Sequence, residues 1–187
     1  MRVRSPVRFI PALIALALAI AVAPRFARAQ DSNAAKARAL VDAAIKMSNS
    51  DQAVKLLWQA TEIDPSLDDA YVYLGFYYNS RSDFANVVKV YQKLVKHEPN
   101  QVSAYLNIGE AYMSFSPPKT DDALIWYRKA YQIDPKNSFA ALRIGQLLAQ
   151  GGNRDEAAKY LRQALADSSN PDNSAKAEKT LREMGAL

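Results

Sequence analysis

Residues 71–78 read YVYLGFYY, and the spacing of their apolar and small side chains is that of an α-helix. The residues of one stripe, Tyr71, Leu74, Gly75 and Tyr78, fall at i, i+3, i+4 and i+7. The pattern returns as YLNIGEAY at residues 105–112 and, with Ala and Leu in place of the outer tyrosines, as ALRIGQLL at residues 141–148. Recurrence at intervals of 34 and 36 residues predicts a stack of similar helical units.

Two further patterns recur at the same interval. An ending with an acidic residue and a proline recurs as EIDP at 62–65, KHEP at 96–99 and QIDP at 132–135, whereas the fourth repeat ends at Ser169. A second pattern recurs as Val87-x3-Tyr91, Ala123-x3-Tyr127 and Ala157-x3-Leu161. A glycine inside a helix costs about 1 kcal/mol relative to alanine, so the recurring glycine indicates a close helix crossing. We expect the small residues Ala53, Ala123 and Ala157 to supply the facing surface.

Taken together, these residues resemble the tetratricopeptide repeat (TPR), whose pattern is an aromatic residue, Leu-Gly, an aromatic residue, Ala-x3-aromatic and a terminal proline. The resemblance implies an all-α fold, a right-handed α-solenoid of about four helix-turn-helix repeats without strands. It divides a TPR domain of residues 30–187 into repeats at about 34–67, 68–101, 102–137 and 138–171, with a capping helix at 172–187. The first copy lacks the Leu-Gly pair, as is typical of an end repeat.

Residues 1–29 have the layout of an export signal. Arginines at positions 2, 4 and 8 precede a stretch without polar side chains at residues 9–23, and Ala27-Arg28-Ala29 forms an A-x-A cleavage site. We expect cleavage after Ala29 and a periplasmic or secreted protein beginning at Gln30. An uncleaved segment would anchor the protein to the membrane, facing the periplasm, and a mitochondrial transit peptide is a further alternative, although its helix would be amphipathic.

The composition excludes several functions. The chain has no cysteine and one histidine, so thiolate chemistry and histidine-rich metal sites are absent. Five of the 24 Lys and Arg residues lie in the signal segment and none of the 19 Asp and Glu residues do, so residues 30–187 are formally neutral. A nucleic-acid partner therefore loses its electrostatic basis. No catalytic, phosphate-binding or metal motif appears, and we expect a non-enzyme without a cofactor.

The candidate binding site is the concave surface that the resemblance implies, lined by the first helix of each repeat. The side chains on that stripe are Val72, Tyr73, Phe76, Asn79, Leu106, Asn107, Glu110, Met113, Phe139, Leu142, Arg143 and Gln146. Apolar and aromatic residues interspersed with polar groups suit a peptide groove. Alternatively, some of them only pack against neighbouring first helices.

Three finer expectations concern single residues. Asn107 and Arg143 stand where TPR proteins with a carboxylate clamp place two of its residues; the remaining clamp positions do not match, so we expect at most an arginine that pairs with a partner carboxylate. Tyr73 and Tyr77 form an i, i+4 pair away from the packing stripe, available either to a partner or to an adjacent loop. His97 aligns with Ile63 and Ile133 and should be half-buried.

The sequence thus predicts a non-catalytic scaffold that binds a protein or peptide in the periplasm and supports assembly or maturation of envelope proteins. A structural self-association module, in which another copy fills the groove or a stack end, is the alternative from another class. An uncleaved N-terminal segment would instead make the protein a membrane-tethered adaptor.

Overall fold

A computed structural model of the chain describes residues 31–47 and 50–187, and the predicted export signal at 1–29 lies outside the described residues. This part of the chain contains nine helices and no strand, which confirms the all-α solenoid. Residues 31–46 form the first helix. The others are α2 (Asp51–Ile63), α3 (Asp68–Ser80), α4 (Phe84–His97), α5 (Val102–Met113), α6 (Thr120–Ile133), α7 (Ser138–Gln150), α8 (Arg154–Leu165) and α9 (Pro171–Glu183).

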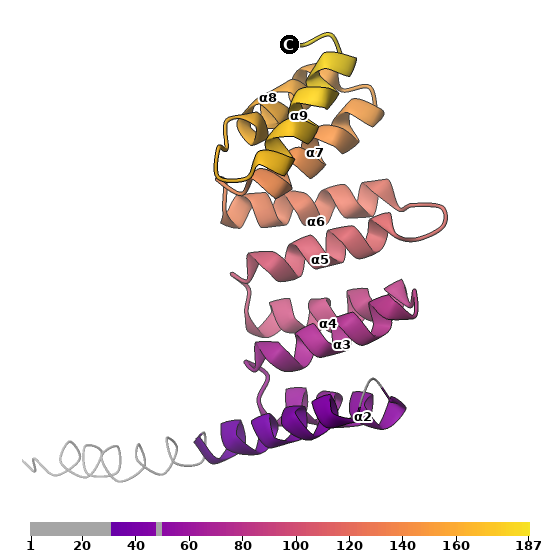
Figure 1. The fold of residues 1–187 in the computed structure, drawn as a ribbon, viewed down its shortest axis with the longest axis vertical. Helices are drawn as coiled ribbons and strands as arrows, with labels where there is room; N and C mark the ends of the chain where they lie inside the picture. Colours follow the sequence, from indigo (N-terminus) through magenta and orange to yellow (C-terminus); the bar gives the residue numbers. More distant parts are fainter. Residues whose placement is uncertain (1–30, 48–49) are drawn as a thin grey trace, which may run out of the picture.

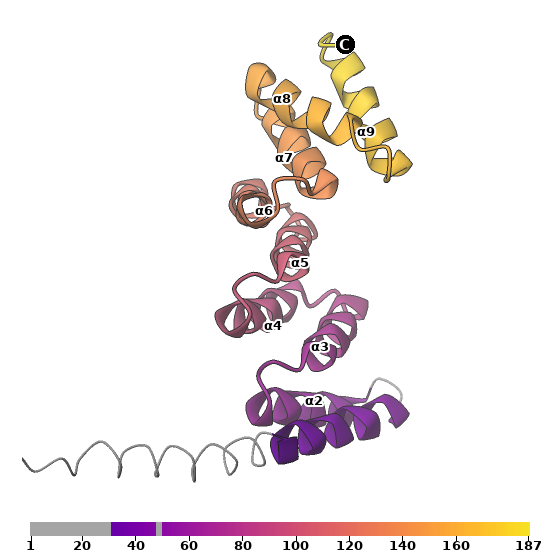
Figure 2. The same cartoon turned by 90° about the vertical axis from the view of Figure 1, so that its left-hand side faces the viewer.

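The helices are stacked along the long axis of the molecule in the order of the sequence (Figure 1). The loops that connect successive helices lie alternately on the left and on the right of the stack in this view. Seen from the side, α3, α5, α7 and α9 lie along one face, which we call the A-side, and α4, α6 and α8 along the other, the B-side, while α2 runs across the bottom of the stack (Figure 2). Each helix packs chiefly on the one before and the one after it, and α7 also packs on α9. The two sides therefore present different helices to solvent.

Short polar residues define where several helices begin and how the chain turns between them. Asp83 accepts a hydrogen bond from the backbone N–H of Asn86 at 3.2 Å, and Asn137 caps α7 in the same way. The turns before α4 and α8 place Ser82 and Gly152 at φ values of 56° and 81°. Glycine adopts this left-handed conformation without steric cost, whereas Ser82 bears some strain.

The glycines of the repeat pattern make room for a side chain of the second helix. A Cβ atom added at Gly109 would lie 2.5 Å from Cε1 of Tyr127, and one at Gly145 would lie 2.6 Å from Cγ of Leu161. Gly75 faces Tyr91 in the same manner. We expected the alanine column to supply the facing surface, and the backbone of Ala157 does lie near Gly145, but the atoms nearest to each glycine belong to the larger residue four positions after that column.

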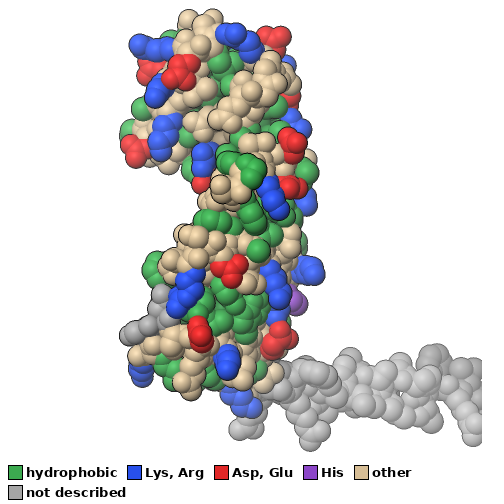
Figure 3. Space-filling view, turned by 90° about the vertical axis from the view of Figure 1, so that its right-hand side faces the viewer, with side chains coloured by type: hydrophobic (Ala, Val, Ile, Leu, Met, Phe, Trp, Pro, Cys, Tyr) green, Lys and Arg blue, Asp and Glu red, His purple; other side chains and the backbone are tan. Residues whose placement is uncertain are grey.

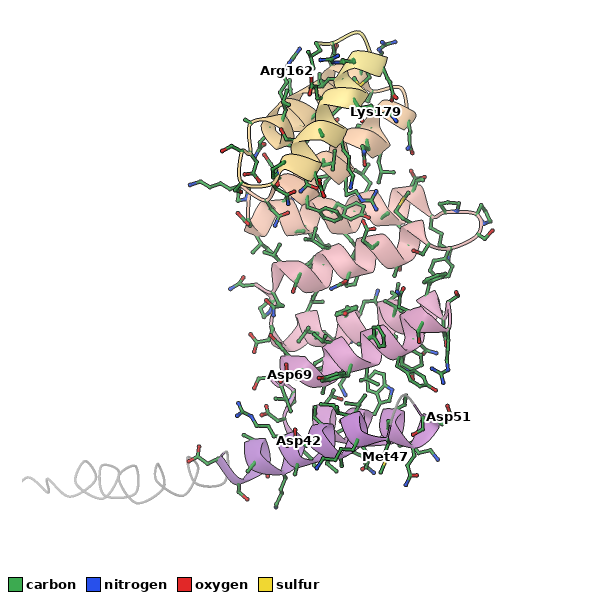
Figure 4. The ribbon with its side chains drawn as sticks, viewed as in Figure 1. Asp42, Met47, Asp51, Asp69, Arg162 and Lys179 are labelled. Atoms are coloured by element: carbon green, nitrogen blue, oxygen red, sulfur yellow. The ribbon has the colours of Figure 1, made fainter. Side chains whose placement is uncertain are left out.

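The last helix, α9, covers α7 and α8 at the C-terminal end of the stack. Its Ala177 and Leu181 are fully buried. Arg162 of α8, labelled in Figure 4, donates from Nη2 to the carbonyl oxygen of Ala186 at 2.8 Å, so the residues after α9 are also fastened to the stack. Among the helices of the described residues, none has both the length and the apolar character needed to cross a membrane.

Candidate functional site

The A-side is hollowed near the middle of the stack. The space-filling view shows a notch there, below the C-terminal helices (Figure 3). Two hollows open on this side, and we name them by their character. The apolar groove is lined by Ala44, Ile45, Ala53, Leu57, Tyr73, Phe76 and Tyr77. The polar groove is lined by Glu110, Phe139, Leu142, Arg143, Gln146, Ala149, Gln150, Lys176, Lys179, Thr180, Glu183 and Met184.

The apolar groove has a volume of about 250 Å³ and lies where α3 meets the two helices before it. Phe76 is 67% exposed and Ile45 is 46% exposed, which is unusual for side chains of this size and polarity. Tyr77 forms the buried wall, and its hydroxyl donates a hydrogen bond to the carboxylate of Asp51 at the start of α2. The groove thus combines a fixed wall with exposed apolar side chains at its mouth.

The polar groove has a volume of about 890 Å³ and is organised by a network across α5, α6 and α7. Arg143 donates from Nε to Oε1 of Glu110 at 2.6 Å and from Nη2 to Oε2, so the guanidinium grips the carboxylate with two hydrogen bonds. The hydroxyl of Tyr127 donates to the same Oε1 at 2.5 Å. The guanidinium carbon also lies 5.4 Å from the ring centre of Phe139.

The network shifts the protonation equilibria of its members. Burial and the hydrogen bond to Glu110 raise the pKa of the Tyr127 hydroxyl, so Tyr127 stays neutral and remains a donor. Burial is the largest single influence on the pKa of Arg143 and would lower it, but the hydrogen bonds and charge interactions with Glu110 and Tyr127 together outweigh burial and raise the pKa of the guanidinium above its usual value. Arg143 is therefore a permanent cation held against a carboxylate of its own chain.

This pairing bears directly on the expected role of Arg143. We expected Arg143 to be available for a carboxylate of a partner. Its Nε and Nη2, however, already donate hydrogen bonds to the carboxylate of Glu110. Asn107, the other residue at a clamp position, is exposed and donates to the carbonyl oxygen of Ser103 at 2.9 Å. It does not line the polar groove with Arg143.

The remaining predicted residues divide into three groups. Leu142 lines the polar groove, but it is only 1% exposed and belongs mainly to the core, because α7 is packed by α6, α8 and α9. Leu106 and Met113 are half-buried against the same core. Val72 is 54% exposed and Asn79 is also exposed, but neither lines the two grooves.

Two other expectations need correction. Tyr77, expected away from the core, is only 7% exposed, because α2 covers it. His97, expected to be half-buried like its isoleucine counterparts, is exposed at the end of α4.

The sequence analysis missed residues outside the first helices of complete repeats. The apolar groove takes Ala44 and Ile45 from the degenerate first repeat, and the polar groove takes Lys176 and Lys179 from α9. Figure 4 labels Lys179 on α9, near the C-terminal end of the stack. Lys176, Thr180 and Glu183 fall at i, i+4 and i+7 of α9 and form a polar stripe beside its apolar face, which was a signal that the sequence offered.

The comparisons with known proteins agree with this geometry. TPR family models match residues 69–138 and 139–170, which together make up more than half of the chain. Tetratricopeptide repeat protein 21B of Mus musculus is 27% identical over 125 residues, a stretch that covers 66% of this chain but only 9% of the mouse protein. The chain therefore spans less than a tenth of that relative.

Solved structures share the fold at low sequence identity. The thermophilic TPR protein TTC0263 of Thermus thermophilus has a TM-score of 0.56 and 21% identity, over 80% of this chain and 84% of its own. MamA has a TM-score of 0.58 and 23% identity, over 78% and 81%. The TPR2B domain of yeast Sti1, solved as a complex with pHsp70, has a TM-score of 0.54 and 21% identity, over 62% and 93%. With its repeat columns, its stacked helix pairs and these matches, the chain belongs to the tetratricopeptide-repeat family.

Proposed function

We propose that this protein is a non-catalytic scaffold that binds an extended segment of a protein partner along its A-side. One observation carries the proposal: Tyr73 and Phe76 hold apolar surface open to solvent at the mouth of the apolar groove, on the same side as the polar groove. Exposed apolar side chains beside a hollow are typical of binding surfaces, and aromatic residues in such places contribute much of the affinity.

The two grooves suggest how such a segment would bind. Apolar side chains of the partner would enter the apolar groove beside Phe76. Gln146, Gln150 and Thr180 offer hydrogen bonds to a backbone that continues across the polar groove. That TPR2B of yeast Sti1, which shares this fold, is found in complex with pHsp70 supports a binding role for such a surface.

We further propose that the protein acts in the bacterial periplasm, where it supports assembly or maturation of envelope proteins. The support is the export-signal pattern of residues 1–29. Intact-mass measurement on protein from the periplasmic fraction should give a chain beginning at Gln30. A chain that keeps residues 1–29 and fractionates with membranes would instead make it a membrane-tethered adaptor.

The binding proposal can be tested by a pull-down from envelope extract. The wild-type protein and a Tyr73→Ala, Phe76→Ala double variant serve as the two baits. A partner captured by wild type should then bind the purified double variant at least about tenfold more weakly. The matched control is Ile125→Ala, which removes an apolar side chain of α6 that is 53% exposed away from both grooves and should leave the affinity unchanged. Equal affinity for wild type and the double variant would place the interface elsewhere.

Self-association is separated by light scattering after size-exclusion chromatography. A dimer that the Tyr73→Ala, Phe76→Ala variant converts to a monomer would show that the A-side binds a second copy. In that case the protein would be a self-association module.

A further inference from the structure

A third hollow, of about 710 Å³, opens on the B-side between α2 and α4. We call it the lysine pocket. Its lining consists of Trp58, Glu62, Lys89, Gln92, Lys93, Lys96 and His97. The A-side grooves and the proposed function involve none of these residues.

The charge of the lysine pocket is strongly one-sided. Lys89, Lys93 and Lys96 fall at i, i+4 and i+7 of α4 and therefore share one face of that helix. Glu62 is the single carboxylate in the lining. Three lysines facing one carboxylate leave a clear excess of positive charge.

One of the three lysines is engaged in holding the structure together. Lys93 forms an ion pair with Glu62 and donates to Oγ1 of Thr61 at 3.2 Å. The hydrogen bond from Lys93 lowers the pKa of the Glu62 carboxyl, which keeps the pair charged. Lys89 and Lys96 are exposed, and within the described residues neither side chain makes an ion pair. Two cations are thus left for a ligand.

The aromatic wall of the pocket is fixed in place. Trp58 is half-buried, and its Nε1 donates to the hydroxyl of Tyr78 at 3.1 Å. Nζ of Lys93 lies 5.3 Å from the centre of a Trp58 ring, a cation–π distance. The indole therefore provides a rigid apolar surface within the pocket.

We propose that the lysine pocket is a second binding site, for an acidic segment of a protein partner in extended conformation. The Cα atoms of Lys89 and Lys96, seven residues apart on a helix, are separated by about 10 Å along its axis. In a polyproline II segment, residues i and i+3 point the same way and lie about 9 Å apart. Acidic residues at that spacing would each meet one of the two lysines, and the residues between them would lie against Trp58.

Other anionic partners fit the pocket less well. A membrane-binding surface inserts its aromatic groups among the lipids, whereas Trp58 is held by Tyr78 and Lys93. Single-stranded nucleic acid stacks successive bases on several aromatic side chains, whereas Trp58 is the single Trp, Tyr or Phe in the lining of the pocket.

The test uses two fluorescein-labelled peptides, Glu-Pro-Pro-Glu-Pro-Pro-Glu and its counterpart with Gln in place of Glu, in which proline enforces the polyproline II conformation. Fluorescence anisotropy with wild type should show the Glu peptide binding at least about tenfold more tightly than the Gln peptide. The affinity should fall as the salt concentration rises from about 50 to about 300 mM.

The variant is the Lys89→Glu, Lys96→Glu pair, which should weaken binding of the Glu peptide at least about tenfold. The control is the Lys136→Glu, Lys159→Glu pair, two exposed lysines on other elements, which changes the net charge equally and should alter the affinity less than about twofold. Circular dichroism checks that both pairs keep wild-type helical content. The Phe76→Ala variant should bind the Glu peptide as wild type does, which separates this site from the A-side.

Three results would overturn the proposal. The first is equal affinity of wild type for the Glu and Gln peptides. The second is equal loss in the two lysine pairs, which would show only a general effect of net charge. The third is binding to phosphatidylglycerol vesicles that the Lys89→Glu, Lys96→Glu pair abolishes, without measurable binding of the Glu peptide, which would assign the pocket to a membrane surface.

Discussion

The apolar and the polar groove lie on the same side of one repeat stack, yet they differ in chemistry. Phe76, Glu110 and Gln146 each follow the repeat glycine and so occupy equivalent positions of successive first helices. Phe76 projects into solvent, whereas Glu110 is held by Arg143 and Tyr127. The repeat thus sets the position of each side chain on its helix, while a residue of the next repeat determines whether that side chain is free to bind a partner.

The strongest test of this comparison concerns the helix crossings beneath the two grooves. Gly109→Ala should lower the free energy of unfolding by about 2 kcal/mol, because the new methyl group meets Cε1 and Cδ1 on one edge of the Tyr127 ring, which Glu110 holds in place. Gly75→Ala should cost less than about 1 kcal/mol, since its methyl group meets mainly the hydroxyl end of Tyr91 and alanine favours the helix. Urea denaturation followed by circular dichroism measures both; equal costs would contradict the role assigned to the Tyr127 hydrogen bond.

A second prediction separates binding from stability. Phe76→Ala should reduce affinity for an A-side partner by about 1–3 kcal/mol, and Gln146→Ala by less than about 1 kcal/mol, because truncating an aromatic anchor loses more apolar contact. Neither change should move the melting temperature by more than about 2 °C, as both side chains lie at the surface. Isothermal titration calorimetry gives the affinities. A larger effect of Gln146→Ala would shift the main anchor to the polar groove.

The third prediction compares two ion pairs. Glu110→Gln should cost about 1 kcal/mol of stability, because the two-pronged contact with Arg143 is partly shielded from water. Glu62→Gln, at a position whose side chain is 73% exposed, should cost less than about 0.5 kcal/mol. The Glu110→Gln variant should also bind peptides ending in a free carboxylate more tightly than wild type, since Arg143 is released. Unchanged affinity for such peptides would show that Arg143 does not contact them.

The smallest expected effect is a change in the free energy of unfolding that appears only at alkaline pH. Burial raises the pKa of Tyr71 to about 12, above the value of about 10 for an unfolded chain, so folding favours the neutral hydroxyl. This contribution is complete below pH 10 and is lost as the pH rises toward 12, where the unfolded state gains stability by ionising. Tyr71→Phe should reduce the loss of stability between pH 9 and 11 by at most about 1 kcal/mol. Tyr73→Phe, at an exposed position, serves as the control; an identical alkaline profile for wild type and Tyr71→Phe would refute the assignment.

The architecture could be predicted because the features that specify it are local and repeated. The glycine and aromatic columns recur at one interval, and each column has one packing role, such as that of Gly109 against Tyr127. The general position of the candidate site followed from the same columns, and Tyr73, Phe76 and Arg143 do line hollows.

What could not be predicted depends on contacts between repeats and at the two ends. Leu142 is buried because α9 adds a third neighbour to α7. The pairing of Glu110 with Arg143 joins residues 33 positions apart, and Gln101 meets Asp68 across the same separation. A search for opposite charges or polar pairs about one repeat apart would have found these contacts, since equivalent positions of successive repeats are neighbours in space.

Each helix packs mainly against the helices next to it in the sequence, and α7 packs also against α9. This pattern of contacts affects how the chain folds. Few long loops must close before native contacts form, so folding should be fast for a chain of this length. Folding can begin at any helix pair and then propagate to the neighbouring helix pair. Hydrogen exchange should accordingly be slowest in the middle of the stack, where each helix is packed by a neighbour on either side.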